Sequence, residues 1–369
     1  MKKVTYNTKK CVLFCPTDTW GGVEKNVALR ARFLTEKDYE VYVIILKGMF
    51  EEHFRKIPNV KIISVNSRGS DINVFVILNY VKILWKIKPF SVFACLKKDW
   101  FLVSLSAKIA RVPRVILYLG IPRIIKNNIK YRFVFNKLKS IVLVNSDSLK
   151  NHLLKTTPFF NSENLFRIYN GFSPQRLNDD KIKIKEKFNL EKDSIIIGCA
   201  GRVSDLKGFD LLPKIIKNLP ENVHVVIAGG NGNNEKQIKK EIRESKQSNR
   251  IHFLGHVNNI HSFFRSIDVF LLCSRKEGMA NVLNEALSHG LPSVSTKVFG
   301  SEELLDHGKY GILTEIENVK EISEALHKII SKDIIFDSNS LKKWIQESFS
   351  MQLMQDRTEQ LFFKDLKKV

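Results

Sequence analysis

The chain has 369 residues, of which 44% are hydrophobic and 27% are charged. This length exceeds one comfortable hydrophobic core, so we expect two domains, and the hydrophobic fraction excludes intrinsic disorder. No apolar run reaches the roughly 18 residues of a membrane-spanning helix, and the N-terminus lacks the apolar segment of a signal peptide. Five cysteines, mostly in strand-like runs, indicate buried thiols in a reducing, cytoplasmic compartment.

The net charge of +22 is unevenly distributed along the chain. Residues 1–180 hold 31 Lys and Arg against 13 Asp and Glu, a net charge of +18, whereas residues 181–369 hold 29 against 25. The N-terminal half therefore indicates an anionic partner, although a Lys-rich composition that serves only solubility gives the same counts.

The N-terminal half alternates apolar strands with helical patterns, which predicts a parallel sheet with helices on both faces. The predicted strands are residues 10–14, 40–46, 60–65, 90–95, 112–119 and 141–145, and the predicted helices are 23–34 and 71–87. Asp147 or Ser148 is expected to cap the next helix. After the first strand, Gly21 and Gly22 allow the backbone to approach a ligand or to take a positive φ, although an ordinary tight turn also explains them.

The stretch from residue 100 to 146 contains nine bases and no acidic residue. Five apolar residues are interleaved with these bases: Ile124, Ile125, Ile129, Phe133 and Leu138. The pattern is typical of a basic amphipathic helix on an anionic membrane surface, with Arg123, Lys126 and Lys130 as candidate contacts for an acceptor or the membrane. A solvated helix that packs through its apolar stripe explains the pattern equally well. Aromatic residues are too few to favour nucleic acid.

The C-terminal half repeats the alternation and predicts a second doubly wound α/β domain. The predicted strands are residues 194–200, 223–228, 251–254, 267–273 and 293–295, and the predicted helices are 209–218, 235–245, 260–265, 281–288 and 320–330. The domains are expected to span residues 1–175 and 185–345, with the linker between 171 and 185. The tail, residues 346–369, is amphipathic from 351 to 368.

Residues 271–290 form a predicted strand, loop and helix. The loop and the positive end of the helix suit a phosphate above the carboxyl end of the strand. Glu277 lies in the loop and Glu285 lies two turns into the helix. Because carboxylates repel phosphate, we expect these two to accept hydrogen bonds from hydroxyls, so a nucleotide sugar fits the site.

A second group of candidate residues follows the strand at 194–200. Gly201 and Arg202 come first, and Lys207 follows five residues on. A departing nucleoside diphosphate develops negative charge, which two fixed cations stabilise more in the transition state than in the ground state. Two surface bases beside a turn are the alternative explanation.

These motifs resemble those of the family 4 (group 1) retaining glycosyltransferases, densely from residue 198 to 313 and thinly from 14 to 123. In the second half, Glu277 and Glu285 form a Glu-x7-Glu signature, and Gly201 to Gly208 form a Gly-Arg-x4-Lys-Gly clamp. Gly229-Gly230 resemble a glycine turn near the nucleotide base. In the first half, Gly21 to Glu24 form a Gly-Gly-x-Glu loop, and Asn170-Gly171 form an Asn-Gly turn that closes the first domain.

The resemblance implies the GT-B fold, in which two doubly wound Rossmann-like domains face a central cleft. It places the acceptor in the N-terminal domain and the nucleotide sugar in the C-terminal domain. It also implies that the last helix crosses back to the N-terminal domain. It assigns the diphosphate to Arg202 and Lys207, the donor sugar to Glu277 and the ribose hydroxyls to Glu285. The remaining donor-binding candidates are Gly21, Gly22, Gly201, Gly229, Gly278, Met279, Ala280, Asn281 and Val282. Because no Asp-x-Asp follows a strand, we expect no bound metal and no cofactor.

The chain departs from the family at one position, where many relatives carry a His at the end of the strand matched by residues 115–119. Tyr118, Leu119 and Gly120 stand there instead, and Arg123 is the candidate replacement.

The expected function is retaining transfer of a sugar from a UDP- or GDP-sugar to a glycan or lipid-linked acceptor, in surface polysaccharide or lipopolysaccharide biosynthesis at the inner face of the plasma membrane. Two alternatives stay open: a sugar-nucleotide epimerase or hydrolase of the same architecture, and a non-catalytic nucleotide- or glycan-binding protein.

Overall fold

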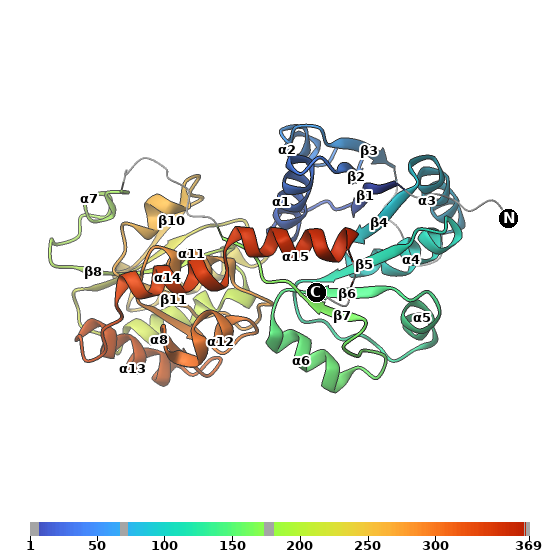
Figure 1. Ribbon diagram of the computed structural model, residues 1–369. Coiled ribbons are helices and arrows are strands. Elements are labelled where there is room, and N and C mark those ends of the chain that lie inside the picture. The colour runs from blue at the N-terminus through green and yellow to red at the C-terminus, as the bar shows by residue number, and fades with distance from the viewer. Residues whose placement is uncertain (1–6, 67–72, 173–180, 365, 367–369) are drawn as a thin grey trace. The chain divides into compact units, whose positions relative to one another are not determined.

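The computed structural model describes residues 7–66, 73–172, 181–364 and 366 (Figure 1). The chain divides into two compact units, of which the first comprises residues 1–170 and 352–369 and the second comprises residues 171–351. Each unit contains one sheet whose paired strands all run parallel. Both units are therefore α/β structures of the doubly wound kind.

The sheet of the first unit has seven strands in the order β3-β2-β1-β4-β5-β6-β7. These are β1 (Asn7–Cys15), β2 (Glu40–Leu46), β3 (Lys61–Val65), β4 (Pro89–Ala94), β5 (Arg114–Leu119), β6 (Ile141–Val144) and β7 (Leu165–Arg167). The helices are α1 (Gly22–Glu36), α2 (Glu51–Arg55), α3 (Val74–Ile87), α4 (Trp100–Ile109), α5 (Ile129–Arg132), α6 (Asp147–Thr156) and α15 (Met351–Phe363), the last of which begins in the second unit.

The sheet of the second unit has six strands in the order β10-β9-β8-β11-β12-β13. These are β8 (Ile195–Ala200), β9 (Val223–Ala228), β10 (Ile251–Gly255), β11 (Val269–Leu272), β12 (Ser293–Thr296) and β13 (Ile312–Thr314). The helices are α7 (Ile184–Lys187), α8 (Leu212–Ile216), α9 (Glu235–Glu244), α10 (Ile260–Phe264), α11 (Asn281–Ser288), α12 (Ser301–Leu304), α13 (Val319–Ile330) and α14 (Ser338–Ser348).

The strands are apolar along their whole length because helices cover both faces of each sheet. In the second unit Ile197, Val225 and Leu271 are almost fully buried, and α8 and α13 pack against this core through residues such as Leu212 and Leu326. Strands buried on both faces lose the alternation of polar and apolar residues, so they appear in a sequence as continuous apolar runs. This is why the predicted strands match the observed ones closely.

The strand order of each sheet reverses at one point, between β1 and β4 in the first unit and between β8 and β11 in the second. At such a point the connections on either side lead to opposite faces of the sheet and leave a crevice at the carboxyl ends of the strands. The glycine loop at residues 21–22 follows β1, and the loops that contain Lys207 and Glu277 follow β8 and β11. The topology alone therefore brings the loops of Lys207 and Glu277 to one edge.

Several local predictions need correction. Ser146, and neither Asp147 nor Ser148, caps α6, because its hydroxyl accepts a hydrogen bond from the N–H of Leu149 at 3.3 Å. The amphipathic helix expected within the basic stretch 100–146 is not continuous, because the stretch contains α4, β5, the four-residue α5, a π-helical turn (Phe133–Lys137) and β6. Helices α2, α4, α7, α12 and α14 and strand β13 were not predicted. Residues 71–72 of the predicted helix 71–87 and residues 173–180 of the predicted linker lie outside the described residues.

The C-terminal helix α15 packs on the first unit. The hydroxyl of Tyr39 donates to Glu359 Oε1 at 2.9 Å, and Arg114 Nη1 donates to the carbonyl of Leu361 at 2.7 Å. The ring of Phe362 stacks on Phe93 with a centroid distance of 5.7 Å. A segment from the end of the chain thus completes the core of the unit that the N-terminus begins.

Two histidine pairs lie in the second unit. His224 Nδ1 is 3.2 Å from His252 Nε2, and His261 Nδ1 is 2.9 Å from His289 Nε2. Burial, together with the charge of the neighbouring histidine, lowers the pKa of His252 and of His289 from 6.5 to about 4. Each pair is therefore neutral in the folded protein at neutral pH.

We expect the free energy of unfolding to fall as the pH drops from about 6.5 to about 4. In that window the histidines of the unfolded chain take up protons while the folded ones resist, so protonation favours unfolding. Urea denaturation at several pH values measures the free energy of unfolding. As the pH is lowered, this free energy should fall less steeply in the double variant His252→Gln with His289→Gln than in the wild type. His327→Gln, at an exposed position of α13, is the matched control. Equal declines in all three proteins would contradict the assignment.

Candidate active site

The central observation in the second unit is an ion pair between the loops that follow β8 and β11. Lys207 Nζ lies 2.6 Å from Glu277 Oε1, and the two side chains are only 19% and 14% exposed. Ser274 Oγ donates a second hydrogen bond to the same carboxylate oxygen at 3.0 Å. A pair this sheltered is screened by salt less than a surface pair. The predicted clamp lysine and the predicted sugar carboxylate therefore form one unit instead of two separate contacts.

Neither partner is saturated by this contact. An ammonium carries three donors and a carboxylate accepts through two oxygens, so both groups keep capacity for a ligand. The stem of Lys207 passes directly over Gly201, where an added Cβ would lie 3.0 Å from Lys207 Cε. Gly201 therefore leaves the space through which the lysine reaches Glu277.

The same two loops also meet backbone to backbone. Gly208 has a φ of +68°, and a Cβ on it would lie 2.1 Å from the carbonyl oxygen of Cys273. The thiol of Cys273 donates to the carbonyl of Lys207 at 3.3 Å. Only glycine satisfies both the left-handed backbone and the close approach. The contact holds the turn of Lys207 against the loop of Glu277.

Sequence reasoning missed Arg275, which binds the loop after β11 to the turn after β8. Its guanidinium donates to both carboxylate oxygens of Asp210 at 2.7 Å and to the carbonyl of Asp205 at 2.6 Å. Burial acts to raise the pKa of Asp210, but the hydrogen bonds and charge of Arg275 outweigh it, so the net pKa is lowered. Bidentate pairs of this kind hold geometry well. An arginine between Ser274 and Glu277 gave no sign in the sequence of its distant partner.

The other predicted site residues of the second unit differ in their exposure and contacts. Arg202 is exposed, and within the described part of the chain no hydrogen bond or ion pair involves its side chain. Gly229 packs against Gly201, because a Cβ added to Gly229 would lie 1.9 Å from the carbonyl oxygen of Gly201. The N–H of Gly229 donates to the carbonyl of Gly255 at 2.7 Å. Glu285 is half-buried on α11.

The segment before α11 offers its backbone and not its side chains. Met279 and Ala280 are only 5% and 2% exposed, so their side chains belong to the core and only their backbone is available to a donor. Gly278 is also buried, whereas Asn281 and Val282 are half-buried. Ala280 is the N-cap residue and offers no side-chain acceptor. The partial positive charge at this helix end is therefore not offset by a capping side chain.

In the first unit, the glycine loop is simpler than predicted. Gly21 has a φ of −152°, and neither it nor Gly22 has a positive φ. The N–H of Gly21 donates to Glu24 Oε2 at 2.9 Å, so this carboxylate caps α1. A Cβ on Gly22 would meet no atom within 4 Å. The positive φ that the sequence allowed is absent at both positions, so close approach of a ligand and an ordinary tight turn are the two explanations left for the glycines.

The position of the missing histidine is filled by a core residue. Tyr118 is 4% exposed, burial raises its pKa, and the guanidinium of the fully buried Arg30 lies 5.6 Å from its ring. Arg123 and Lys126 are exposed on the segment between β5 and α5, and Lys130 Nζ lies 5.8 Å from the ring centroid of Phe101. Tyr118 therefore does not present a polar group in place of the imidazole.

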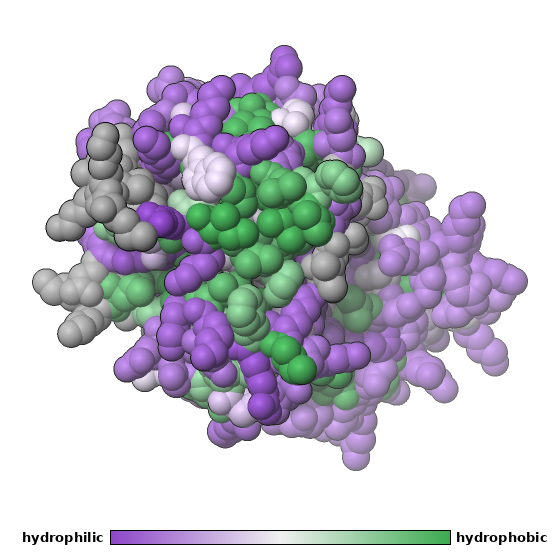
Figure 2. All heavy atoms as spheres, turned by 90° about the vertical axis from the view of Figure 1, so that its right-hand side faces the viewer, coloured by the Kyte–Doolittle hydropathy of each residue, from purple (hydrophilic) through white to green (hydrophobic). Residues whose placement is uncertain are grey.

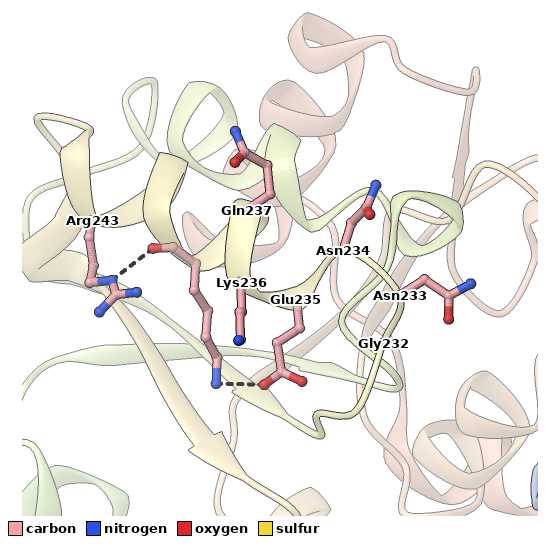
Figure 3. Close-up of a pocket in the computed structure, with 8 residues that line it drawn as sticks. Gly232, Asn233, Asn234, Glu235, Lys236, Gln237 and Arg243 are labelled. Carbon is pink, nitrogen blue, oxygen red and sulfur yellow. Dashed lines mark hydrogen bonds and ion pairs between the residues drawn. The ribbon is translucent and has the colours of Figure 1, made fainter.

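A shallow hollow of about 610 Å³ lies beside the N-terminal half of α9 (Figure 3). Its lining residues are Gly232, Asn233, Asn234, Glu235, Lys236, Gln237, Lys239 and Arg243. Lys239 pairs with Glu235 at 2.6 Å, and Asn234 Nδ2 donates to Asp205 Oδ2 at 2.6 Å. None of the predicted site residues lines this hollow, so it is not the expected donor site.

Among the described residues, no group of three His, Cys, Asp or Glu side chains has a metal-binding arrangement. No helix in the same part of the chain has the length and apolarity to cross a bilayer. All five cysteines are buried and free, as the sequence predicts.

One part of the chain matches a known family. Residues 180–351 match the family model of the glycosyl transferases group 1. The second unit is therefore similar to the glycosyl transferases group 1. The matched segment includes Lys207, Glu277 and Arg275, so the ion pair at the edge of the sheet lies inside it.

Relatives extend the likeness to the whole chain. The capsular polysaccharide biosynthesis glycosyltransferase CapM of Staphylococcus aureus is 24% identical over 371 residues, which cover 94% of this chain and 96% of the relative. The crystal structure of Anabaena Alr3699/HepE in complex with UDP and glucose has a TM-score of 0.77 at 20% identity, over 95% of this chain and 98% of that one. A glycosyltransferase from Rickettsia africae ESF-5 has a TM-score of 0.82 at 19% identity, over 97% and 98%. The two α/β units are those of the GT-B glycosyltransferase fold.

Replacement of Gly208 by Ala should destabilise the second unit more than replacement of Gly255 by Ala. Both glycines have a positive φ, of +68° and +80°, but only the methyl on Gly208 would meet a backbone oxygen. The shared strain costs about 1–2 kcal/mol, and we expect overpacking to add about 1–3 kcal/mol to Gly208→Ala alone. Chemical denaturation measures both variants. Equal losses would show that the loop after β11 moves aside.

Proposed function

We propose that this chain is a retaining glycosyltransferase of family 4 that uses a UDP- or GDP-sugar as donor and a glycan or lipid-linked acceptor. In this proposal the second unit binds the donor and the first unit binds the acceptor. The observation that carries it is the ammonium of Lys207, held by Glu277 where the strand order reverses, within the segment that matches the glycosyl transferases group 1. Dinucleotide and nucleotide ligands of doubly wound folds bind at that point.

The proposed chemistry needs positive charge more than it needs a base. As the bond between the anomeric carbon and the diphosphate oxygen breaks, negative charge grows on the leaving group. Lys207, Arg202 and the N-terminal end of α11 would stabilise that charge, and we expect them to do so without a divalent metal. The acceptor hydroxyl then bonds to the anomeric carbon on the same face, and its proton passes to the departing diphosphate.

Glu277 has two parts in this proposal. One oxygen orients the ammonium of Lys207, and the carboxylate retains capacity to accept a hydrogen bond from a hydroxyl of the donor sugar. Glu285 would accept hydrogen bonds from the ribose hydroxyls. The buried side chains of Met279 and Ala280 leave the backbone of residues 278–282 as the part that would contact the donor.

The proposed acceptor belongs to surface polysaccharide or lipopolysaccharide biosynthesis at the inner face of the plasma membrane. CapM, a relative that aligns over nearly the whole chain, is named for capsular polysaccharide biosynthesis. The net charge of +18 on residues 1–180 suits an anionic lipid surface.

A sugar-nucleotide epimerase or hydrolase needs an acid and a base beside the sugar. Tyr118 is buried against Arg30, so the strand that carries a histidine in many relatives offers no such group here. Transfer to an acceptor therefore remains the function that the geometry supports best.

Replacement of Lys207 by Ala should lower kcat by about tenfold to a thousandfold, because the leaving diphosphate loses a preorganised cation. Lys214→Ala, an exposed lysine of α8, is the matched control and should leave kcat unchanged. Transfer is measured as nucleoside diphosphate released in the presence of acceptor. Unchanged turnover in Lys207→Ala would remove this residue from the mechanism.

Binding of the donor can be separated from turnover by thermal shift with a panel of UDP- and GDP-sugars. A ligand that binds the folded state raises Tm by mass action, so the true donor should stand out from the panel. Glu285→Gln should reduce that shift, because its carboxylate is assigned to the ribose. A panel in which no nucleotide sugar raises Tm would contradict the proposed donor.

A further inference from the structure

Helix α3 of the first unit carries large apolar side chains on both of its faces. Its inner face is buried against the unit through residues such as Val76, Tyr80 and Leu84. Its outer face carries four large apolar side chains that are between 51% and 84% exposed: Val74, Phe75, Leu78 and Trp85, called here the α3 patch. A surface helix of a globular protein normally turns a polar face to solvent. The α3 patch is therefore not explained by the core of the unit.

The α3 patch continues onto neighbouring elements. Helix α4 packs beside α3, where Ser106 Oγ donates to the carbonyl of Ile77 at 3.4 Å, and Phe101 of α4 lies 6.5 Å from Phe133 between ring centroids. Exposed apolar residues continue there at Ile109 and Phe133, which are 45% and 40% exposed. Figure 2 shows this end of the first unit as an apolar area surrounded by hydrophilic side chains.

Within residues 73–146 the charge is almost entirely of one sign. Residues 73–146 contain fourteen Lys and Arg but only one acidic residue, Asp99, whose side chain is fully buried. Three of the bases, Lys82, Lys86 and Lys88, are exposed on α3 and at its C-terminal end. Apolar side chains ringed by cations, with no exposed carboxylate among these residues, complement an anionic lipid surface.

The direction of α3 gives this surface a relation to the acceptor site. Strands β3 and β4 are both parallel to β1 and β2, so the connection between them must run back across the sheet. Helix α3 therefore starts toward the carboxyl edge, with Val74, Phe75 and Leu78 at that end, and finishes toward the amino edge. The loop of Gly21 and Gly22 lies at the same carboxyl edge.

We propose that the outer face of α3 docks the first unit on an anionic bilayer. Phe75, Leu78 and Trp85 enter the interface between headgroups and acyl chains, where aromatic side chains are favoured, and Lys82, Lys86 and Lys88 contact lipid phosphates. The end of the docked face that carries Val74 and Phe75 is the one nearest the carboxyl edge of the sheet. The inference rests on the proposed lipid-linked acceptor, and it assigns the main apolar contact to α3, outside the 100–146 stretch that the sequence indicated.

The test is flotation of the full chain with vesicles of phosphatidylcholine alone and of phosphatidylcholine mixed with phosphatidylglycerol. The wild type should float with the anionic vesicles, and high salt should weaken the association. The variant Phe75→Ser with Leu78→Ser and Trp85→Ser should bind about tenfold or more weakly. Ile335→Ser, which removes a side chain that is 77% exposed in the second unit, is the matched control and should bind like the wild type.

Thermal shift and light scattering distinguish loss of membrane docking from loss of the fold or of a dimer. The Tm shift with the donor nucleotide sugar should be the same in the triple variant and the wild type, which shows that the fold and the proposed donor site are intact. Equal flotation of the triple variant and the wild type would overturn the docking surface, and no flotation of the wild type would overturn membrane docking while leaving the transferase proposal. If light scattering shows a wild-type dimer that the triple variant loses, α3 is instead an interface between two copies of this chain.

Discussion

The ion pair between Lys207 and Glu277 is the interaction on which the candidate site depends. It joins two loops that are 70 residues apart in the chain, at the point where the strand order reverses. Both side chains are less than one-fifth exposed, so each charge would be costly to bury without the other. Three other residues support this pair. Gly201 leaves space for the side chain of Lys207, and Gly208 allows the backbone contact between the two loops. Arg275 holds the loop of Glu277 in place.

The two units share a topology but present different surfaces. The second unit gathers opposite charges at the carboxyl edge of its sheet, where a diphosphate could join them. In the first unit, a Cβ on Gly22 at that edge would meet no atom within 4 Å, and Glu24 accepts a hydrogen bond from Gly21 at the start of its own helix. Apolar and basic side chains of this unit are exposed on α3 and α4. This contrast fits the division proposed for the enzyme, in which one substrate is a water-soluble nucleotide and the other is anchored in lipid.

Tyr118 and Arg30 show how a family position can lose its usual chemistry. The guanidinium of Arg30 is fully buried, and it lies 5.8 and 5.6 Å from the ring centroids of Phe93 and Tyr118, which also contact each other. Such contacts satisfy a buried cation in part through the π-faces. The tyrosine is therefore committed to the core, and the transferase proposal does without a side chain there that would contact the donor.

The sequence by itself determined the two parallel α/β units, since strands buried on both faces appear as continuous apolar runs, and it located Lys207, Glu277 and Glu285 because their spacing follows strand ends. It failed where a property depends on partners far away in the chain. The bidentate pair of Arg275 with Asp210, the burial of Met279 and Ala280, and the exposure of Phe75 and Trp85 carry no local signal. An apolar residue has the same identity in a core and on a docking surface, so only the tertiary structure, which decides what covers it, could distinguish the two.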